Sequence, residues 1–254
     1  MNGVWFYALG SVLIVSIISL IGIFTLGLQE KQLKAFLLYF VSFAAGALFG
    51  DVFLHLLPDI VAQTGGFTLQ ASFLVLSGIV LSFIVEKIVH WRHCHYIDHN
   101  HGKKDPVHPF AVMSLLGDAV HNFLDGIVIG VSYLVSIPVG VATTLAVVFH
   151  EIPQEIGDFG VLLQGGFTKG KALFYNFLVA LTSFVGVILA LFLNKYVVAL
   201  PQYLLPLAAG GFLYIAGSDL IPELHKEVKS WKSILELAMF LLGIAVMAVL
   251  LLWG

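Results

Sequence analysis

Eight long apolar runs take up most of this 254-residue chain. Each holds roughly 20 or more residues, which is the length that a helix needs to cross the hydrocarbon layer of a bilayer. The runs lack the alternating pattern of a barrel strand, so only helices would satisfy their backbone hydrogen bonds in lipid. We therefore predict an all-α, polytopic membrane protein with eight transmembrane helices. They lie at about 4–28, 34–59, 68–91, 109–133, 138–164, 171–194, 200–223 and 232–253.

The composition fits a membrane-embedded chain and excludes several other classes of protein. The chain is 59% hydrophobic and 11% charged, and its mean hydropathy is +1.00, so a soluble domain of this kind could not cover its surface. The net charge of -3 argues against a nucleic-acid partner. The single cysteine, Cys94, excludes a disulfide framework and a multi-cysteine zinc site. We expect one transmembrane domain over residues 1–254, surrounded by the lipid bilayer.

The basic residues predict how the helices are oriented. Of the 12 lysines and arginines, 11 fall in alternate loops, and only Lys195 falls on the opposite side. Cytoplasmic loops of membrane proteins carry the excess of basic residues. These loops are therefore expected in the cytosol and both termini outside it, with the plasma membrane as the expected location. The 11 residues are Lys31, Lys34, Lys87, Arg92, Lys103, Lys104, Lys169, Lys171, Lys226, Lys229 and Lys232.

A short motif occurs twice in the chain. AAG at 44–46 is followed after eight residues by HLLPD at 55–59, and AAG at 208–210 is followed after eight residues by DLIPE at 219–223. The first copy lies on a helix that runs outward and the second on one that runs inward, so the copies predict an inverted repeat. Helices 1–3 and 6–8 would then surround a central pair, helices 4 and 5. Inverted repeats are typical of transporters.

Histidines gather in the connection between the third and fourth helices. Six of the chain's ten lie between His90 and His108, in the stretch HWRHCHYIDHNHGKKDPVH. Histidine-rich tracts bind metal ions in some proteins, and a solvated polar linker is the other interpretation. The candidate cytoplasmic metal loop covers about 92–108 and contains His93, His95, His99 and His101.

The fourth apolar run contains ionisable residues in the stretch GDAVHNFLDG (117–126). His121 and Asp125 are four residues apart and share a helix face, with Asp118 one turn before His121. The predicted centre of this helix falls near residue 121. The polar residues are therefore expected close to the middle of the bilayer.

The fifth apolar run contains a second group, in HEIPQEIGD. His150 and Gln154 are four residues apart, as are Glu151 and Glu155, and Asp158 follows one turn later. The predicted helix centre falls near residue 151, so this group lies at the same depth as the one on the fourth helix. A short connection between the two helices makes them antiparallel neighbours.

Ionisable groups at this depth require an explanation. Each costs about 2.5–3.5 kcal/mol at the bilayer centre on insertion scales. Hydrogen bonds between membrane helices return only about 0.6 kcal/mol on average. Adhesion between helices therefore does not offset the cost, and we interpret these residues as lining the bundle interior or an aqueous path.

Imidazole, carboxylate and amide groups together suit a borderline divalent ion such as Zn²⁺. Such an ion would be the transported substrate, and no catalytic cofactor is expected. The first predicted site comprises His121, Asp125, His150 and Gln154. The second, adjacent and richer in oxygen, comprises Asn122, Asp125, Glu151 and Glu155.

Two other functions fit parts of this pattern. HEIPQ resembles the HExxH motif, and LDG at 124–126 resembles the Asp motif of intramembrane site-2 metalloproteases. However, two histidines four residues apart hold zinc in HExxH, residue 154 is Gln, and the Asp motif comes first here. A proton-coupled carrier of a small organic substrate is the second alternative, although it explains the paired imidazoles poorly. We expect no enzyme.

HNFLDG (121–126) and HEIPQEIGDFGVLLQGG (150–166) resemble the paired fourth- and fifth-helix motifs of the ZIP (Zrt/Irt-like) family of divalent-metal transporters. Within that family the chain is similar to the branch whose fifth helix reads HExPHE. It departs from the branch at Gln154, where the branch has His, and this leaves the metal preference open. The resemblance covers nearly the whole chain, and the other matching stretches are 48–59, 175–186 and 206–224.

The resemblance implies eight helices with both termini outside and uptake of Zn²⁺ into the cytosol, with Cd²⁺, Fe²⁺ and Mn²⁺ as further candidate ions. It also implies a homodimer, because the family is commonly dimeric. Asn176 stands where other members place a ligand from the sixth helix. The residues that it implies on the fourth and fifth helices are His121, Asn122, Asp125, His150, Glu151 and position 154.

Further polar residues extend the predicted path on both sides of the membrane midplane. On the outer side, His55 and Asp59 would attract the ion, and Asp51 lies on the same helix. The inverted repeat favours alternating access over an open pore. The predicted inner residues are Asp118, Asp158, Asp219, Glu223 and His225.

Overall fold

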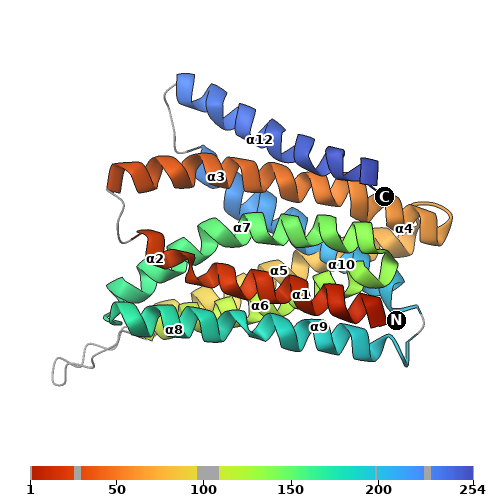
Figure 1. The fold of residues 1–254 in the computed structure, drawn as a ribbon, viewed down its shortest axis with the longest axis horizontal. Coiled ribbons are helices and arrows are strands. Elements are labelled where there is room, and N and C mark those ends of the chain that lie inside the picture. Colours follow the sequence, from red (N-terminus) through yellow and green to blue (C-terminus); the bar gives the residue numbers. More distant parts are fainter. Residues whose placement is uncertain (1, 26–29, 96–108, 198, 226–229, 254) are drawn as a thin grey trace.

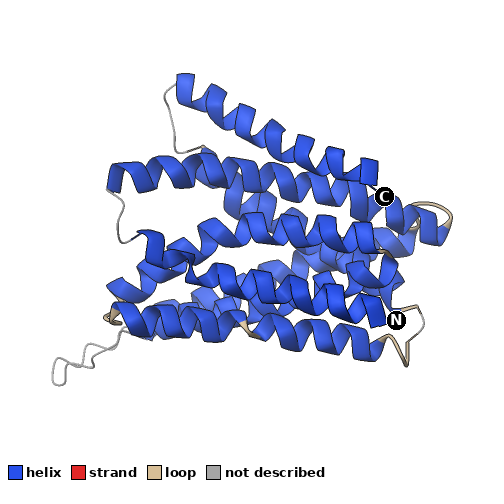
Figure 2. Cartoon of the chain, viewed as in Figure 1, coloured by secondary structure: helices blue, strands red, loops and turns tan. Residues whose placement is uncertain are grey.

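Helices occupy the predicted spans. The computed structural model describes residues 2–25, 30–95, 109–197, 199–225 and 230–253, and within these ranges it contains helices and no strand (Figures 1 and 2). The predicted all-α fold is confirmed. The elements are α1 (Asn2–Ile18), η1 (Ser19–Ile21), α2 (Gly22–Thr25), α3 (Glu30–Asp51), η2 (Val52–Leu56), α4 (Leu57–Thr64), α5 (Leu69–His95), α6 (Pro109–Val135), α7 (Ile137–Gln164), α8 (Lys169–Ala180), α9 (Thr182–Leu193), α10 (Leu200–Tyr214), η3 (Ile215–Leu220), α11 (Ile221–Leu224), α12 (Ser230–Leu250) and η4 (Leu251–Trp253).

Seven helical segments in the described part of the chain are long and apolar enough to cross a membrane. The eighth predicted span is α7, which has 28 residues. Its length does not set it apart from the seven, but its polar residues His150, Glu151, Gln154, Glu155 and Asp158 make it less apolar. It packs against α1, α3 and α6 inside the bundle. The seven segments are Gly3–Thr25, Leu37–Thr64, Leu69–Ile88, Ser114–Val135, Lys169–Leu193, Leu200–Leu224 and Ser230–Leu250.

Two spans contain a π-helical turn at matching positions of the repeated motif. The turn η2 connects α3 to α4, and the turn η3 connects α10 to α11. A proline follows each turn, Pro58 in the first span and Pro222 in the second. Because proline has no N–H, the carbonyl four residues earlier loses its α-helical donor, and the wider π register lets the helix continue. The shared irregularity supports the repeat that the sequence predicts.

Glycines at matching positions of the repeat let two helix pairs approach closely. A Cβ on Gly46 of α3 would lie 2.0 Å from the Phe240 carbonyl oxygen of α12, and a Cβ on Gly210 of α10 would lie 2.1 Å from the Val75 carbonyl oxygen of α5. Small residues allow such backbone contact between membrane helices. The pairing of α3 with α12, visible in Figure 1, therefore mirrors the pairing of α10 with α5.

The central pair consists of α6 and α7. Only Ser136 separates the two helices, and its hydroxyl accepts a hydrogen bond from the Val139 N–H at 3.3 Å, which caps α7. So short a connection makes them antiparallel neighbours. α6 contacts α5 and α10, while α7 contacts α3 and α8. Each central helix thus touches both halves of the repeat.

The ends of the described chain lie at the same end of the bundle (Figure 1), as an even number of spans requires. Their place outside the cytosol stays a prediction. The helix α5 continues through His95, so His93 and His95 belong to a helix, and the histidine loop begins after residue 95 rather than at 92. His99 and His101 lie outside the described residues.

Candidate metal centre

Two histidines and two carboxylates from the central helices converge on one point. α6 contributes His121 and Asp125, one turn apart on the same face, and α7 contributes the neighbours His150 and Glu151. One donor atom of each residue lies within 4.8 Å of the other three. Because α6 and α7 are antiparallel, the middle of one helix meets the middle of the other. We call these four residues the midplane cluster.

The spacing within the midplane cluster fits a tetrahedral metal site. The His121 Nε2 atom lies 3.2 Å from His150 Nε2, 3.1 Å from Glu151 Oε1 and 3.5 Å from Asp125 Oδ2. The His150 Nε2 atom lies 3.2 Å from Asp125 Oδ2 and 3.6 Å from Glu151 Oε1. Zinc–donor bonds of about 2.0–2.1 Å separate tetrahedral donors by about 3.3–3.4 Å. The five distances lie on either side of that value.

The midplane cluster is enclosed except at His121. Asp125, His150 and Glu151 are buried, whereas 20% of the His121 side chain is exposed. Asp125 Oδ2 and Glu151 Oε1 face the two imidazoles, and neither these two atoms nor Glu151 Oε2 have another hydrogen-bond partner among the described residues. Carboxylate oxygens and imidazole lone pairs repel when they face one another. The arrangement is therefore favourable only with a proton or a metal cation among the donors.

Two contacts outside the midplane cluster fix the orientation of the His150 ring. Its Nδ1 atom lies 3.1 Å from the Ala146 carbonyl oxygen one turn earlier, so Nδ1–H donates to that oxygen and the Nε2 lone pair faces the cluster. The Phe212 ring of α10 packs edge-on against the imidazole, with ring centroids 5.9 Å apart. Outer contacts of this kind orient metal-binding histidines.

Glu151, which the sequence interpretation assigned to the second site, brings its carboxylate to the two histidines and Asp125. Gln154 is on the same helix face as His150, because the two are four residues apart. It lines the cavity together with His121 and Asp125. Its role as a donor of the first predicted site stays a prediction.

Two residues of the predicted oxygen-rich site, Asn122 and Glu155, have buried oxygen atoms, and Asn176 adds a third. Asn122, Glu155 and Asn176 are buried, and Asn176 of α8 donates its Nδ2–H to Glu155 Oε2 at 2.9 Å. Asn122 Oδ1, Asn176 Oδ1 and Glu155 Oε1 have no hydrogen-bond partner among the described residues. Together with Asp125 and Glu151, they offer hard oxygen donors for a second ion.

The predicted outer residues lie along one span, with Asp51 at the end of α3, His55 in the π-helical turn η2 and Asp59 in α4. Asp51 is fully buried and accepts a hydrogen bond from the Thr143 hydroxyl at 3.5 Å. His55 Nε2 lies 3.0 Å from the Met247 carbonyl oxygen of α12. Asp59 is half-buried one turn further on. The structure thus encloses Asp51 and His55 in protein, whereas His121 of the midplane cluster is partly exposed.

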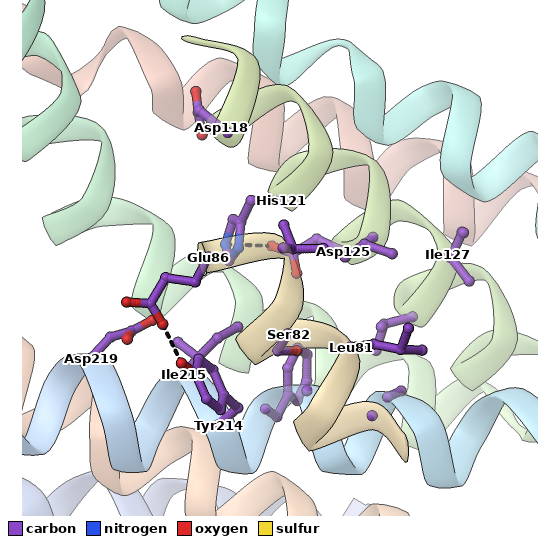
Figure 3. A pocket seen from close by; sticks show the side chains of 18 of the residues that line it. Leu81, Ser82, Glu86, Asp118, His121, Asp125, Ile127, Tyr214, Ile215 and Asp219 are labelled. Atoms are coloured by element: carbon purple, nitrogen blue, oxygen red, sulfur yellow. Dashed lines mark hydrogen bonds and ion pairs between the residues drawn. The ribbon is translucent and has the colours of Figure 1, made fainter. Parts of the chain in front are cut away.

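A cavity of about 550 Å³ opens beside the midplane cluster (Figure 3). His121 and Asp125 form part of its wall, and the remaining walls come from α5, α7, α10 and η3. The lining residues Glu86 and Asp219 lie near the ends of their spans, so the cavity leads from the cluster toward the end of the bundle where α5 and α7 end and α6 begins.

The cavity brings together part of the predicted inner path. Asp118, Asp158 and Asp219 all line it. Glu223 in α11 and His225 directly after it are exposed and are not among the lining residues. The predicted inner residues therefore divide into three on the cavity wall and two beyond it.

The sequence interpretation missed Glu86 and Tyr214. Glu86 of α5 accepts a hydrogen bond from the Tyr214 hydroxyl of α10 at the cavity wall (Figure 3). The signal in the sequence was a single acidic residue directly before Lys87, near the end of an apolar run. Charges at a membrane boundary produce the same pattern, which is why Glu86 did not stand out.

Fold and site together define a polytopic membrane protein with a candidate divalent-metal centre at its core. The chain matches the family model described as ZIP zinc transporter over residues 2–111 and 91–251. The chain therefore belongs to the ZIP zinc transporter family, and the family resemblance predicted from the motifs is confirmed.

Individual relatives extend this similarity over most of the chain. Zinc transporter ZIP13 of Pongo abelii is 34% identical over 220 residues, which cover 82% of this chain and 64% of that protein. The zinc transporter ZIP13 homolog of Drosophila melanogaster is 31% identical over 318 residues, 96% of this chain and 88% of that protein. Zinc transporter SLC39A7 of Mus musculus is 29% identical over 330 residues, 97% of this chain and 69% of that protein. The chain thus spans about two thirds of the length of Pongo ZIP13 and mouse SLC39A7.

Proposed function

We propose that this chain transports divalent metal ions across a membrane, with Zn²⁺ as the principal substrate. The observation that supports this most directly is the midplane cluster, in which two nitrogen and two oxygen donors stand at the spacing of a tetrahedral ion. Two neutral imidazoles and two carboxylates balance the charge of a divalent ion, which lowers the free energy of holding it in lipid surroundings. Each relative described above is named a zinc transporter.

The proposed mechanism is alternating access, with uptake into the cytosol. The cavity leads from the midplane cluster toward the end of the bundle that carries Lys169 and Lys171, which the distribution of basic residues predicts to be cytosolic. On the opposite side, Asp51 and His55 are enclosed. A site reached from one face, within an inverted repeat, fits the inward-facing state of such a transporter.

The proposal also covers the other candidate ions, the membrane, the oligomeric state and the orientation of the termini. Cd²⁺ shares the preference of Zn²⁺ for nitrogen donors, whereas Mn²⁺ and Fe²⁺ would use the oxygen donors of Asn122, Glu155 and Asn176 more. We further propose that the protein acts in the plasma membrane, as a homodimer, with both termini outside the cytosol. The family's commonly dimeric state and the basic residues are the grounds for these parts.

The alternative functions fit the geometry less well. In a metalloprotease, Glu151 would have to be free as a general base, but its carboxylate is one of the four donors. A small organic substrate would not use two imidazoles and two carboxylates whose donor atoms stand only 3.1 to 3.6 Å apart, which is the spacing around a single ion. We therefore propose no enzyme activity and no organic substrate.

Uptake by purified protein in liposomes tests the proposal. Zn²⁺, Cd²⁺, Mn²⁺ and Fe²⁺ would each be offered with and without a pH gradient. We expect Zn²⁺ uptake that His150→Ala abolishes, while Ser77→Ala, on an exposed face of α5, keeps it. Protein that is folded but moves no metal, or that cleaves peptides instead, would contradict the proposal.

A further inference from the structure

Two aspartates lie between the midplane cluster and the mouth of the cavity. Asp118 precedes His121 by one turn on α6, and Asp158 follows Glu151 by two turns on α7. Because the helices are antiparallel, both aspartates lie on the same side of the cluster. Both line the cavity, as do Ser114 and Gln154, so an ion in the cavity can reach them.

One oxygen of each aspartate is held by a neighbour on α6. Asn122 donates its Nδ2–H to Asp118 Oδ1 at 2.8 Å, and the Ser114 hydroxyl donates to Asp158 Oδ1 at 3.1 Å. Asp118 is 5% exposed, and its Oδ2 atom has no hydrogen-bond partner among the described residues. Gln154 lies within side-chain hydrogen-bonding reach of Asp118. Asp118 is thus oriented by Asn122, with Gln154 as a further polar neighbour.

The charges around Asp118 and Asp158 favour the binding of a cation. Asp118 is repelled by both Asp158 and Glu151 and attracted by His121. Of the described residues that line the cavity, His121 is the only basic one, and it also faces the two carboxylates of the midplane cluster. Carboxylates that outnumber their basic partners in an enclosed site are costly in free energy. A divalent ion between Asp118 and Asp158 would remove that cost.

We propose that Asp118 and Asp158, with Gln154 and Ser114, bind a second divalent cation, and we call these four residues the inner acidic site. This inference rests on the proposed transport function and adds an intermediate site to it. All of its donors are oxygens, which suit Mn²⁺ relative to Zn²⁺ better than the imidazoles of the midplane cluster do. A Zn²⁺ ion that leaves the cluster would be held more weakly here, and this favours release into the cavity.

Mn²⁺ binding to the purified full chain tests the inner acidic site. The protein in lipid nanodiscs would first receive one equivalent of Zn²⁺ to fill the midplane cluster. Mn²⁺ would then be titrated and its free form followed by electron paramagnetic resonance. We expect Mn²⁺ binding that Asp118→Asn and Asp158→Asn each weaken by about tenfold or more, since even outer contacts of a metal site are worth that much; any Mn²⁺ at the oxygen donors of Asn122, Glu155 and Asn176 should keep its affinity in both variants.

A matched control and a separate readout keep the two proposals apart. Glu86→Gln removes a carboxylate from the same cavity wall without touching the site, so Mn²⁺ binding should stay as in the wild type. Zn²⁺ binding that depends on His121 and His150 reports on the midplane cluster alone, and on the folding of each variant. Mn²⁺ binding that is absent, or whose affinity and stoichiometry are unchanged in both Asp118→Asn and Asp158→Asn, would overturn the inner acidic site. Failure of Zn²⁺ binding in the wild type would instead overturn the proposed function.

Discussion

The Nε2 atoms of His121 and His150 lie 3.2 Å apart although 29 positions separate the two residues in the sequence. Each histidine comes from a different helix, and their rings meet edge-on with centroids 5.3 Å apart. A relative slide of α6 against α7 by one residue, about 1.5 Å, would already break the spacing of the donors. Metal binding in this protein is therefore coupled to how the two central helices sit against each other.

Asp125→Ala should abolish Zn²⁺ uptake while the protein still folds. The carboxylate contacts both histidines of the midplane cluster, at 3.5 Å and 3.2 Å, so its loss removes a donor and leaves Glu151 as the only carboxylate among the four donors. Uptake would be measured in liposomes per folded molecule, and Asp125→Glu, which keeps the charge, should retain part of it. Normal uptake by the alanine variant would show that Asp125 does not hold the ion.

Gln154→His should tighten Zn²⁺ and Cd²⁺ binding relative to Mn²⁺, because imidazole is a softer donor than an amide oxygen. Glu151→Gln should weaken Zn²⁺ binding by at least about tenfold, since Glu151 supplies the fourth donor of the midplane cluster. Metal competition at equilibrium on the two variants and the wild type measures both effects. An unchanged preference in Gln154→His would mean that residue 154 never contacts a bound ion.

Deletion of residues 97–105 should leave most of the transport activity. This segment follows the end of α5 at His95, and the donors of the midplane cluster lie on other helices. Flux and correct insertion would be measured together in liposomes. Complete loss of flux by a correctly inserted deletion variant would place the histidine loop on the ion's path.

Gly46→Ala should destabilise the bundle by about 1–3 kcal/mol, which is typical of overpacking. The added Cβ would meet the Phe240 carbonyl oxygen at 2.0 Å, and the backbone of α12 would have to move. Gly10→Ala on α1 is the matched control, because nothing lies within 4 Å of its Cβ position. Thermal unfolding in detergent compares the two variants, and equal midpoints would contradict the packing described for α3 and α12.

Ala47→Cys should react with a membrane-impermeant thiol reagent from the outer side when the transporter faces outward. Ala47 is fully buried. It occupies the position directly after the first AAG motif, and Gly211 occupies the equivalent position after the second. Gly211 lines the open cavity. In alternating access the two halves of the repeat exchange conformations, so Ala47 would line an outward-open cavity. The background is Cys94→Ser, and Ala8→Cys on α1, equally buried, is the control. Equal protection of both cysteines under all metal conditions would argue against alternating access.

Much of the fold could be predicted from the sequence because lipid imposes strict local requirements. An apolar run of sufficient length must form a helix there, so the spans, the all-α fold and the pairing of helices 4 and 5 follow from the order of residues. Polar side chains in such runs cannot face lipid. That condition alone predicted that His121, Asp125, His150 and Glu151 would lie inside the bundle.

Tertiary structure decided which of these side chains meet. Glu151 joins His121, Asp125 and His150 because the rotation of α7 is set by its packing against α1, α3 and α6 together. Asn176 of α8 meets Glu155 of the preceding helix α7, and Tyr214 meets Glu86 across 128 positions of the sequence. Helix rotation, side-chain reach and the position of the cavity depend on the sum of many such long-range contacts. Local sequence determines what each helix offers, and packing determines the partner that it meets.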